Sequence, residues 1–294
     1  MSSFSPSDAA LEGFRLTREQ PLAILAWSGV YALGIVAMAA VMSIGLGPNF
    51  ITFLRTNSLQ PGDVEAVKQF GAMLVGAWPA FLVALLIAIF ILAVLTAGIY
   101  RIVLRPQERG FAHLRIGADE VRLAVTHLLL ACIGIGTFVT TEIIIALALQ
   151  ALGGERMLPA LQNLGGALLL AVLAFAPMAW VGVRLSLATP LAFYEKRISL
   201  PAAWRLTRGK FWPLFAMILL SLLFYVMIWA LFTIISYVMV SLAGGQAAMA
   251  APTRSVAALA ALLAATAIQL LLYILQAVMS YAPFAVAYRQ LRDS

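Results

Sequence analysis

Six long apolar blocks alternate with short polar segments, and they limit what this chain can fold into more than any other feature. Each block approaches or exceeds the roughly 20 residues that a helix needs to cross about 30 Å of hydrocarbon. Only 11% of the residues are charged, whereas soluble domains carry roughly 25%. The sequence therefore predicts an all-α fold, a polytopic membrane helical bundle forming one integral membrane domain over residues 1–294. The predicted spans are 22–46, 72–100, 123–151, 165–193, 213–243 and 255–287.

Basic residues are distributed unevenly between the segments that connect these spans. Fifteen of the 19 Lys and Arg residues lie in the N-terminal and C-terminal segments and in the connections between spans 2 and 3 and spans 4 and 5. Short loops rich in Lys and Arg stay in the cytoplasm, so we expect both termini there. The same placement accounts for the net charge of +7 without a nucleic-acid partner.

A short motif recurs before the odd-numbered spans. Residues 14–18 read Phe-Arg-Leu-Thr-Arg, residues 204–208 read Trp-Arg-Leu-Thr-Arg, and residues 114–116 read Leu-Arg-Ile. Each even span closes on a tyrosine near basic residues, at Tyr100, Tyr194 and Tyr288. These signals predict three helical-hairpin repeats, with units near 8–105, 108–197 and 199–294. The alternative is that any cytoplasmic flank collects arginine and aromatic residues.

The segments before the odd spans have the composition of cytoplasmic interfacial helices. In residues 200–214, aromatic and aliphatic side chains alternate with basic ones, and Pro201 suits the first turn of a helix. The aromatic rings would lie at headgroup depth while the basic groups meet anionic lipid phosphates. A plain helical linker is the alternative. The predicted headgroup-binding residues are Arg15, Arg18, Arg115, Arg205, Arg208 and Lys210.

The stretch from Pro190 to Trp212 carries a family resemblance. A span ends in proline with a following glutamate, and an Ala-x-x-Leu-Thr-x-Gly-x-Phe-Trp element opens the next span. The matching residues are Pro190, Glu195, Ala203, Leu206, Thr207, Gly209, Phe211 and Trp212. This pattern resembles the membrane domain fused to some bacterial glycerophosphodiester phosphodiesterases, and related six-span inner-membrane proteins. The resemblance implies a multi-pass protein of the bacterial inner (plasma) membrane. It does not imply phosphodiesterase activity, because no segment here could hold a TIM barrel of roughly 200 residues or more.

Glu142 is the acidic residue that lies deepest inside a predicted span. An ionisable side chain there costs about 2.5–3.5 kcal/mol on insertion scales, so it usually faces a partner or a water-filled cavity. Thr141 adjoins it and Gln269 lies at a comparable depth in the sixth span, so these three side chains are a candidate intramembrane polar site. Such a site suits a transported proton or cation. A protonated carboxyl that joins two helices by a hydrogen bond is the alternative.

Small residues form a stripe on the sixth span, at Ala257, Ala261 and Ala265. Residues of this size at every fourth position let helix backbones approach closely. We therefore expect a helix-packing interface there, either inside the chain or between two copies.

Patterns for catalysis or metal binding are not recognisable in the sequence. His113 and His127 have no acidic or thiol neighbours at ligand spacing. We expect no catalytic site, metal or cofactor. The leading interpretation is a non-enzymatic inner-membrane protein that handles or organises lipids or an envelope component. The alternatives are a small secondary transporter that uses Glu142, and an accessory subunit of a larger membrane complex.

Overall fold

The computed structural model describes residues 4–56, 64–108, 110–151, 153, 163–245 and 256–292. Within these ranges every regular element is helical. The elements are α1 (Pro6–Glu19), α2 (Pro21–Thr56), α3 (Val64–Gly76), α4 (Trp78–Leu104), the 3-10 turn η1 (Phe111–His113), α5 (Ala118–Ala151), α7 (Leu164–Leu185), α8 (Ala188–Tyr194), α9 (Leu200–Leu206), α10 (Phe211–Leu242) and α12 (Val256–Arg292).

Six helical stretches in the described ranges are long and apolar enough to cross a membrane, which confirms the predicted multi-pass fold. They are Pro21–Pro48, Trp78–Leu104, Phe111–Ala151, Leu164–Tyr194, Phe211–Leu242 and Ala258–Arg292. The predicted start of the second span at residue 72 is wrong, because the helix is interrupted at Ala77 and α4 begins at Trp78. Pro79 stands in the first turn of α4, where a missing N–H costs nothing, whereas its ring would clash with a continuing helix.

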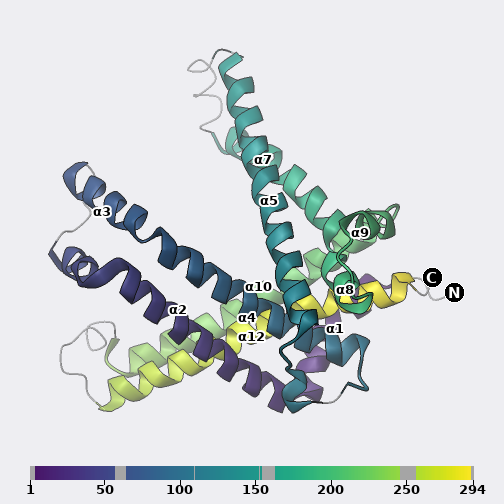
Figure 1. The fold of residues 1–294 in the computed structure, drawn as a ribbon, viewed down its shortest axis with the longest axis horizontal. Coiled ribbons are helices and arrows are strands. Elements are labelled where there is room, and N and C mark those ends of the chain that lie inside the picture. Colours follow the sequence, from purple (N-terminus) through teal and green to yellow (C-terminus); the bar gives the residue numbers. More distant parts are fainter. Residues whose placement is uncertain are drawn as a thin grey trace.

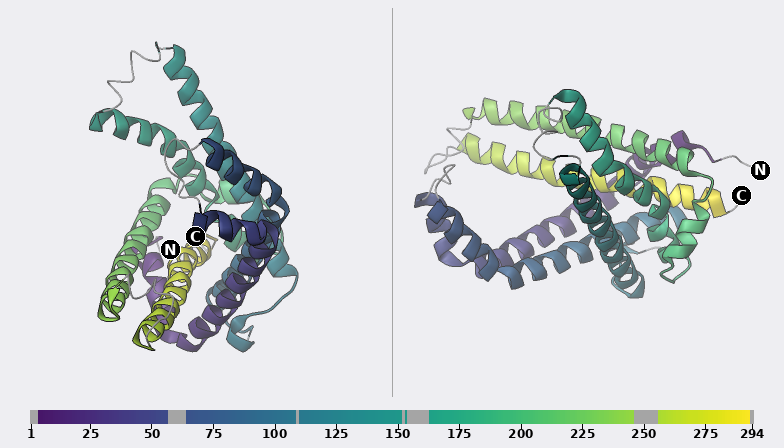
Figure 2. Two further views of the ribbon diagram at one scale, coloured as in Figure 1. Left: turned by 90° about the vertical axis from the view of Figure 1, so that its left-hand side faces the viewer. Right: turned by 90° about the horizontal axis from the view of Figure 1, so that it is seen from above.

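The spans pack in antiparallel pairs of sequence neighbours. Helix α2 lies along α4, α5 along α7, and α10 along α12 (Figures 1 and 2). Two glycines of α2 allow the first pair to pack closely. A side chain at Gly34 would overlap Ile91 of α4, and one at Gly45 would overlap Ala80. The α5–α7 pair diverges from the other two pairs with increasing distance from the end that carries the termini (Figure 1).

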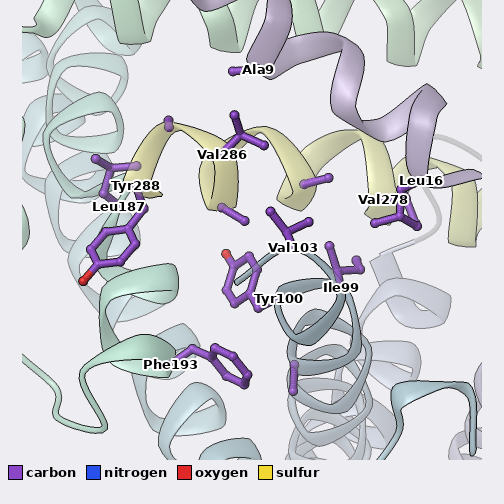
Figure 3. Packing of buried hydrophobic residues seen from close by; sticks show 14 of the residues in the cluster. Ala9, Leu16, Ile99, Tyr100, Val103, Leu187, Phe193, Val278, Val286 and Tyr288 are labelled. Atoms are coloured by element: carbon purple, nitrogen blue, oxygen red, sulfur yellow. The ribbon is translucent and has the colours of Figure 1, made fainter. Parts of the chain in front are cut away.

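The buried core lies where the ends of α4, α8 and α12 meet, and we call this region the junction. Figure 3 shows side chains converging there from the three helices and from Leu187, which directly precedes α8; those from the helices are Ile99, Tyr100, Val103, Phe193, Val286 and Tyr288. Tyr100 and Tyr288 are almost completely buried, and the Tyr100 hydroxyl shares a hydrogen bond of 2.6 Å with Thr189 Oγ1. Ser5, just before α1, lies beside the end of α12, because its backbone N donates to Gln290 Oε1 at 3.4 Å.

Arginines from other helices cap the exposed carbonyl groups at the junction. Arg105 donates to the main-chain oxygens of Phe193 and Tyr194, at 2.8 and 3.1 Å, where α8 ends. Arg289 of α12 donates to Val103 O at 3.3 Å, where α4 ends. The last carbonyl groups of a helix lack partners within that helix and carry partial negative charge, so a guanidinium is a favourable cap.

Beyond the junction the spans expose large apolar side chains, such as Leu147 on α5 and Leu231 on α10. Apolar faces of this extent are found on proteins that contact a membrane or another protein. Hydrocarbon around the spans would cover them without cost, so the placement of the core at one end fits a membrane protein.

Each segment that precedes an odd-numbered span packs on a hairpin other than its own. Helix α1 lies against α10 and α12, η1 against α2 and α4, and α9 against α7 and α8. Gly13 permits the first contact, because a Cβ there would meet Met279 of α12 at 2.5 Å. The three contacts link the hairpins in a closed order.

The prediction of a helix around Arg115 is wrong. Residues 114–116 are irregular, between η1 and the start of α5. The turn just before them is held by side chains of other helices, since Trp27 Nε1 donates to Ala112 O and Arg101 donates to His113 O, both at 2.9 Å. These two anchors come from α2 and α4, and the sequence around Arg115 gives no sign of them.

Candidate functional site

A group of exposed cations precedes α10, at the junction end of the molecule. Arg205, Arg208 and Lys210 are exposed, and within the described residues none of them forms an ion pair. Trp212 follows with 73% of its surface exposed. Its ring contacts Phe211 edge-on, with centroids 5.3 Å apart. We call these cations together with Trp212 the basic patch.

Local chain geometry presents the basic patch outward. Ser199 caps α9 by accepting from Ala202 N at 3.4 Å, and Pro201 lies in the first turn. After α9 the chain reverses through Gly209, whose φ of 75° lies in the left-handed region that side chains disfavour. Thr207 is buried and donates to the main-chain oxygen of Arg184 at 2.9 Å. The turn is therefore fixed to the end of α7.

Aromatic and charged contacts strengthen the same attachment. The Arg184 guanidinium lies 4.7 Å from the ring centroid of Trp204, and the Trp180 ring meets Trp204 edge-on at 5.0 Å. Arg184 is buried, so its charge is covered by the indole rather than exposed to water. Glu195, on the same side, accepts from the Tyr288 hydroxyl at 3.2 Å and from Arg197 Nε at 2.8 Å. These contacts give physical roles to Glu195 and Thr207, two of the matching residues between Pro190 and Trp212.

Helix α1 presents the two N-terminal candidates differently. Its buried face consists of Ala9, Ala10 and Leu16, together with Glu12. Arg15 pairs with Glu12 at 2.6 Å, and this hydrogen bond and the carboxylate charge raise the pKa of Arg15 above its usual value. Arg18 is exposed. Arg18 can meet a headgroup directly, whereas Arg15 is already partly neutralised.

Arg115 belongs to a second charged site, a pocket of about 300 Å³ between α4, α5 and the loop that joins them. Arg101 and Glu120 form an ion pair at its base, with side chains only 2% and 1% exposed. Arg115 lies at the rim, 3.9 Å from Glu108. The charged residues lining the pocket are Arg101, Glu108, Arg115, Asp119, Glu120, Arg122 and Lys196.

Ion pairs neutralise most of this pocket. Asp119 accepts from Arg122 at 2.6 Å and from Arg105 at 3.2 Å. The Arg105 guanidinium also lies 4.6 Å from the ring centroid of Phe193. The acidic residues therefore mainly hold α4, α5 and α8 together. Sequence reasoning missed them, although Asp119 and Glu120 stand out as adjacent acids in a basic connection.

The candidate polar site around Glu142 is not assembled by the described residues. Glu142 is exposed and borders an open groove of about 360 Å³ between α5 and α7, whose other lining side chains are apolar. Thr141 donates to Thr137 O at 2.8 Å, along its own helix. Gln269 is exposed on α12. In the described part of the chain the Glu142 carboxylate has no hydrogen-bond partner, contrary to the expectation of a polar neighbour.

The alanine stripe on α12 faces the interior of the chain in part. Ala261 is buried and Ala265 is half-buried, while the side chain of Ala257 lies outside the described residues. The neighbouring Ala258 is completely buried. Helix α12 packs against α2, α4 and α10 of the same chain.

Across the described residues, no group of three His, Cys, Asp or Glu side chains is placed to hold a metal ion. Comparison of the chain with protein-family models, with curated proteins and with solved structures finds no match.

Proposed function

We propose that this chain is a non-enzymatic integral membrane protein that binds anionic lipid headgroups at the side carrying its termini. One observation carries the proposal, namely that the exposed cations of the basic patch, beside the exposed Trp212, form no ion pair with any described residue. Tryptophan is enriched at the headgroup level, and each basic residue near an anionic surface contributes about 1 kcal/mol of attraction.

The geometry separates the strong headgroup candidates from the weak ones. Arg205, Arg208 and Lys210 have no acidic partner within the described residues, so a lipid phosphate would meet their full charge. Arg15 and Arg115 each lie near a glutamate and should contribute less. Arg18 adds an exposed cation on α1, which packs on α10.

We also propose three repeated units, near 8–105, 108–197 and 199–294, with both termini in the cytoplasm of a bacterium and the spans in its inner membrane. The pattern of contacts between the hairpins supports the repeat. The segments η1 and α9 each pack on the hairpin that precedes them in the chain, and α1, which has no hairpin before it, packs on the last one. Helices α1 and α9 each end before the following span begins, and Gln20 and Thr207 are their C-terminal capping residues. This break supports an interfacial position for both helices.

Lipid retention by the purified full chain tests the headgroup proposal. The triple variant Arg205→Gln, Arg208→Gln and Lys210→Gln should retain several-fold less phosphatidylglycerol in native mass spectrometry, with phosphatidylcholine retention unchanged. The matched control is Arg205→Lys with Arg208→Lys, which keeps the charges and should keep the lipid. Equal phosphatidylglycerol retention by the triple variant and the unmodified chain would disprove the proposal.

The transporter and accessory-subunit interpretations stay predictions from the sequence. A proton or cation site at Glu142 would need a second polar group, and the described residues supply none within hydrogen-bond reach. Proton-coupled flux in proteoliposomes tests the first interpretation. Co-purification of a second protein at fixed stoichiometry tests the other.

A further inference from the structure

A cavity of about 340 Å³ lies between α5, the α7–α8 break and α12, close to the junction. Its volume falls within the range of small-molecule sites, which starts near 300 Å³. Most of its lining is apolar, and hydroxyl groups and one imidazole occur among the lining residues. The residues that matter for its chemistry are His127, Gly134, Thr137, Gly182, Thr189 and Tyr281.

His127 supplies a polar atom without a partner beside this cavity. Its Nε2 is buried and has no hydrogen bond to any described residue. The ring meets Tyr281 edge-on, with centroids 5.6 Å apart. Three of the hydroxyls that line the cavity are engaged, since Thr137 donates to Ile133 O and Ser186 to Val183 O, both at 2.8 Å, and Thr189 bonds to Tyr100 at 2.6 Å. The Tyr281 hydroxyl has no hydrogen bond to a described residue. Buried polar atoms are usually paired, so a ligand group at Nε2 would remove an unfavourable arrangement.

Two glycines keep the cavity open. Gly134 of α5 and Gly182 of α7 line it, and a Cβ built on either one meets no atom within 4 Å. Glycine inside a helix is unfavourable relative to alanine, and at these positions no close contact with a described residue requires it. Space for a ligand would account for both glycines.

The lining also limits the charge of the ligand. The residues around the cavity include no Asp, Glu, Lys or Arg. An ionised head would therefore be buried without a counter-charge, which is strongly unfavourable. The cavity belongs to three of the membrane-spanning stretches, Phe111–Ala151, Leu164–Tyr194 and Ala258–Arg292, so a molecule dissolved in the bilayer could reach it.

We propose that this cavity binds a membrane lipid whose head is an uncharged hydroxyl, of the diacylglycerol class. A hydroxyl both donates and accepts, so it can pair with either tautomer of His127 while its chains follow the apolar lining. The site is separate from the basic patch, and the proposal does not depend on anionic headgroup binding.

A photoactivatable diacylglycerol tests the site in the full chain, reconstituted in phosphatidylcholine nanodiscs. We expect saturable labelling of peptides from α5, α7–α8 and α12. Gly182→Leu should fill the cavity and lower labelling about tenfold, and Gly134→Leu serves the same purpose if the first variant fails to fold. The matched control is Gly136→Leu, since Gly136 also lies on α5 with nothing within 4 Å of its Cβ and does not line the cavity. This control should label like the unmodified chain.

His127→Phe tests the hydrogen bond, because it keeps an aromatic ring against Tyr281 and removes the nitrogen. It should weaken diacylglycerol binding by up to about tenfold, the worth of one hydrogen bond. Unchanged labelling in both glycine variants, or in His127→Phe, would overturn the proposal. Equal labelling by a photoactivatable phosphatidylglycerol at the same peptides would overturn the uncharged head. Neutralising the basic patch should leave diacylglycerol labelling intact, which separates this site from the headgroup proposal.

Discussion

Arg101 of α4 and Glu120 of α5 form an ion pair in which both side chains are almost completely buried. Arg101 also donates to His113 O at 2.9 Å, so one guanidinium holds the loop and the start of the next helix. Glu108 lies farther away, 3.9 Å from Arg101 Nε. A buried pair of this kind is costly to break, because the remaining charge loses its closest partner.

Removing one member of this pair should destabilise the fold. Glu120→Gln removes the closer counter-charge of the buried guanidinium, leaving Glu108 at 3.9 Å from its Nε, and should cost up to about 3–5 kcal/mol. The double variant Arg101→Met with Glu120→Leu removes both charges and should cost less. Thermal unfolding in detergent measures both variants. A double variant less stable than Glu120→Gln would show that the loop contact of Arg101, and not the buried charge, dominates.

Replacing Gly209 or Gly136 by alanine should change the free energy of unfolding in opposite directions. Gly209 has a φ of 75°, so Gly209→Ala should destabilise the turn before α10 by about 1–2 kcal/mol. Gly136 lies inside α5 with open space beside it, so Gly136→Ala should stabilise that helix by up to about 1 kcal/mol. Unfolding measured under identical conditions compares the two. A stabilising Gly209→Ala would contradict the observed backbone conformation.

Hydrophobicity alone located the spans, because a helix in hydrocarbon must be apolar along its length whatever its neighbours are. The predicted start at residue 72 was wrong, because α4 begins at Trp78, with Pro79 in its first turn, within an apolar stretch that hydropathy cannot divide.

The charged pocket and the cavity could not be predicted in the same way. Arg101 and Glu120 lie on either side of the loop between α4 and α5. Trp27 of α2 bonds to that loop at Ala112 O, and this contact cannot be read from the sequence of the loop. Glu142 appeared important because its depth makes charge costly, but depth does not reveal whether a partner approaches. The α5–α7 pair diverges from the other hairpins. Among the described residues, the groove beside Glu142 is therefore lined by α5 and α7 alone, and its other side chains are apolar.

Topology is predicted from the distribution of basic residues. Reporter fusions after residues 108 and 199 should read cytoplasmic, and fusions after residues 58, 154 and 248 should read extracytoplasmic, because short Lys- and Arg-rich loops stay inside. Paired alkaline phosphatase and fluorescent-protein reporters give opposite signals at each site. An active phosphatase at residue 199 would reverse the orientation and place the basic patch on the outer side.

Substitutions at Glu142 determine whether its carboxylate has a role. The side chain is exposed and unpaired within the described residues, so neither Glu142→Gln nor Glu142→Leu should lower thermal stability. Glu142→Leu should also improve insertion of α5, because an acidic residue near the middle of a span costs about 2.5–3.5 kcal/mol. The insertion efficiency of the isolated span and the melting temperature of the full chain measure these effects. A clear loss of stability in Glu142→Leu that Glu142→Gln does not share would mean that the carboxyl bonds to another helix. Loss of proton-coupled flux in Glu142→Gln, with unchanged melting, would instead favour the transporter interpretation over lipid binding.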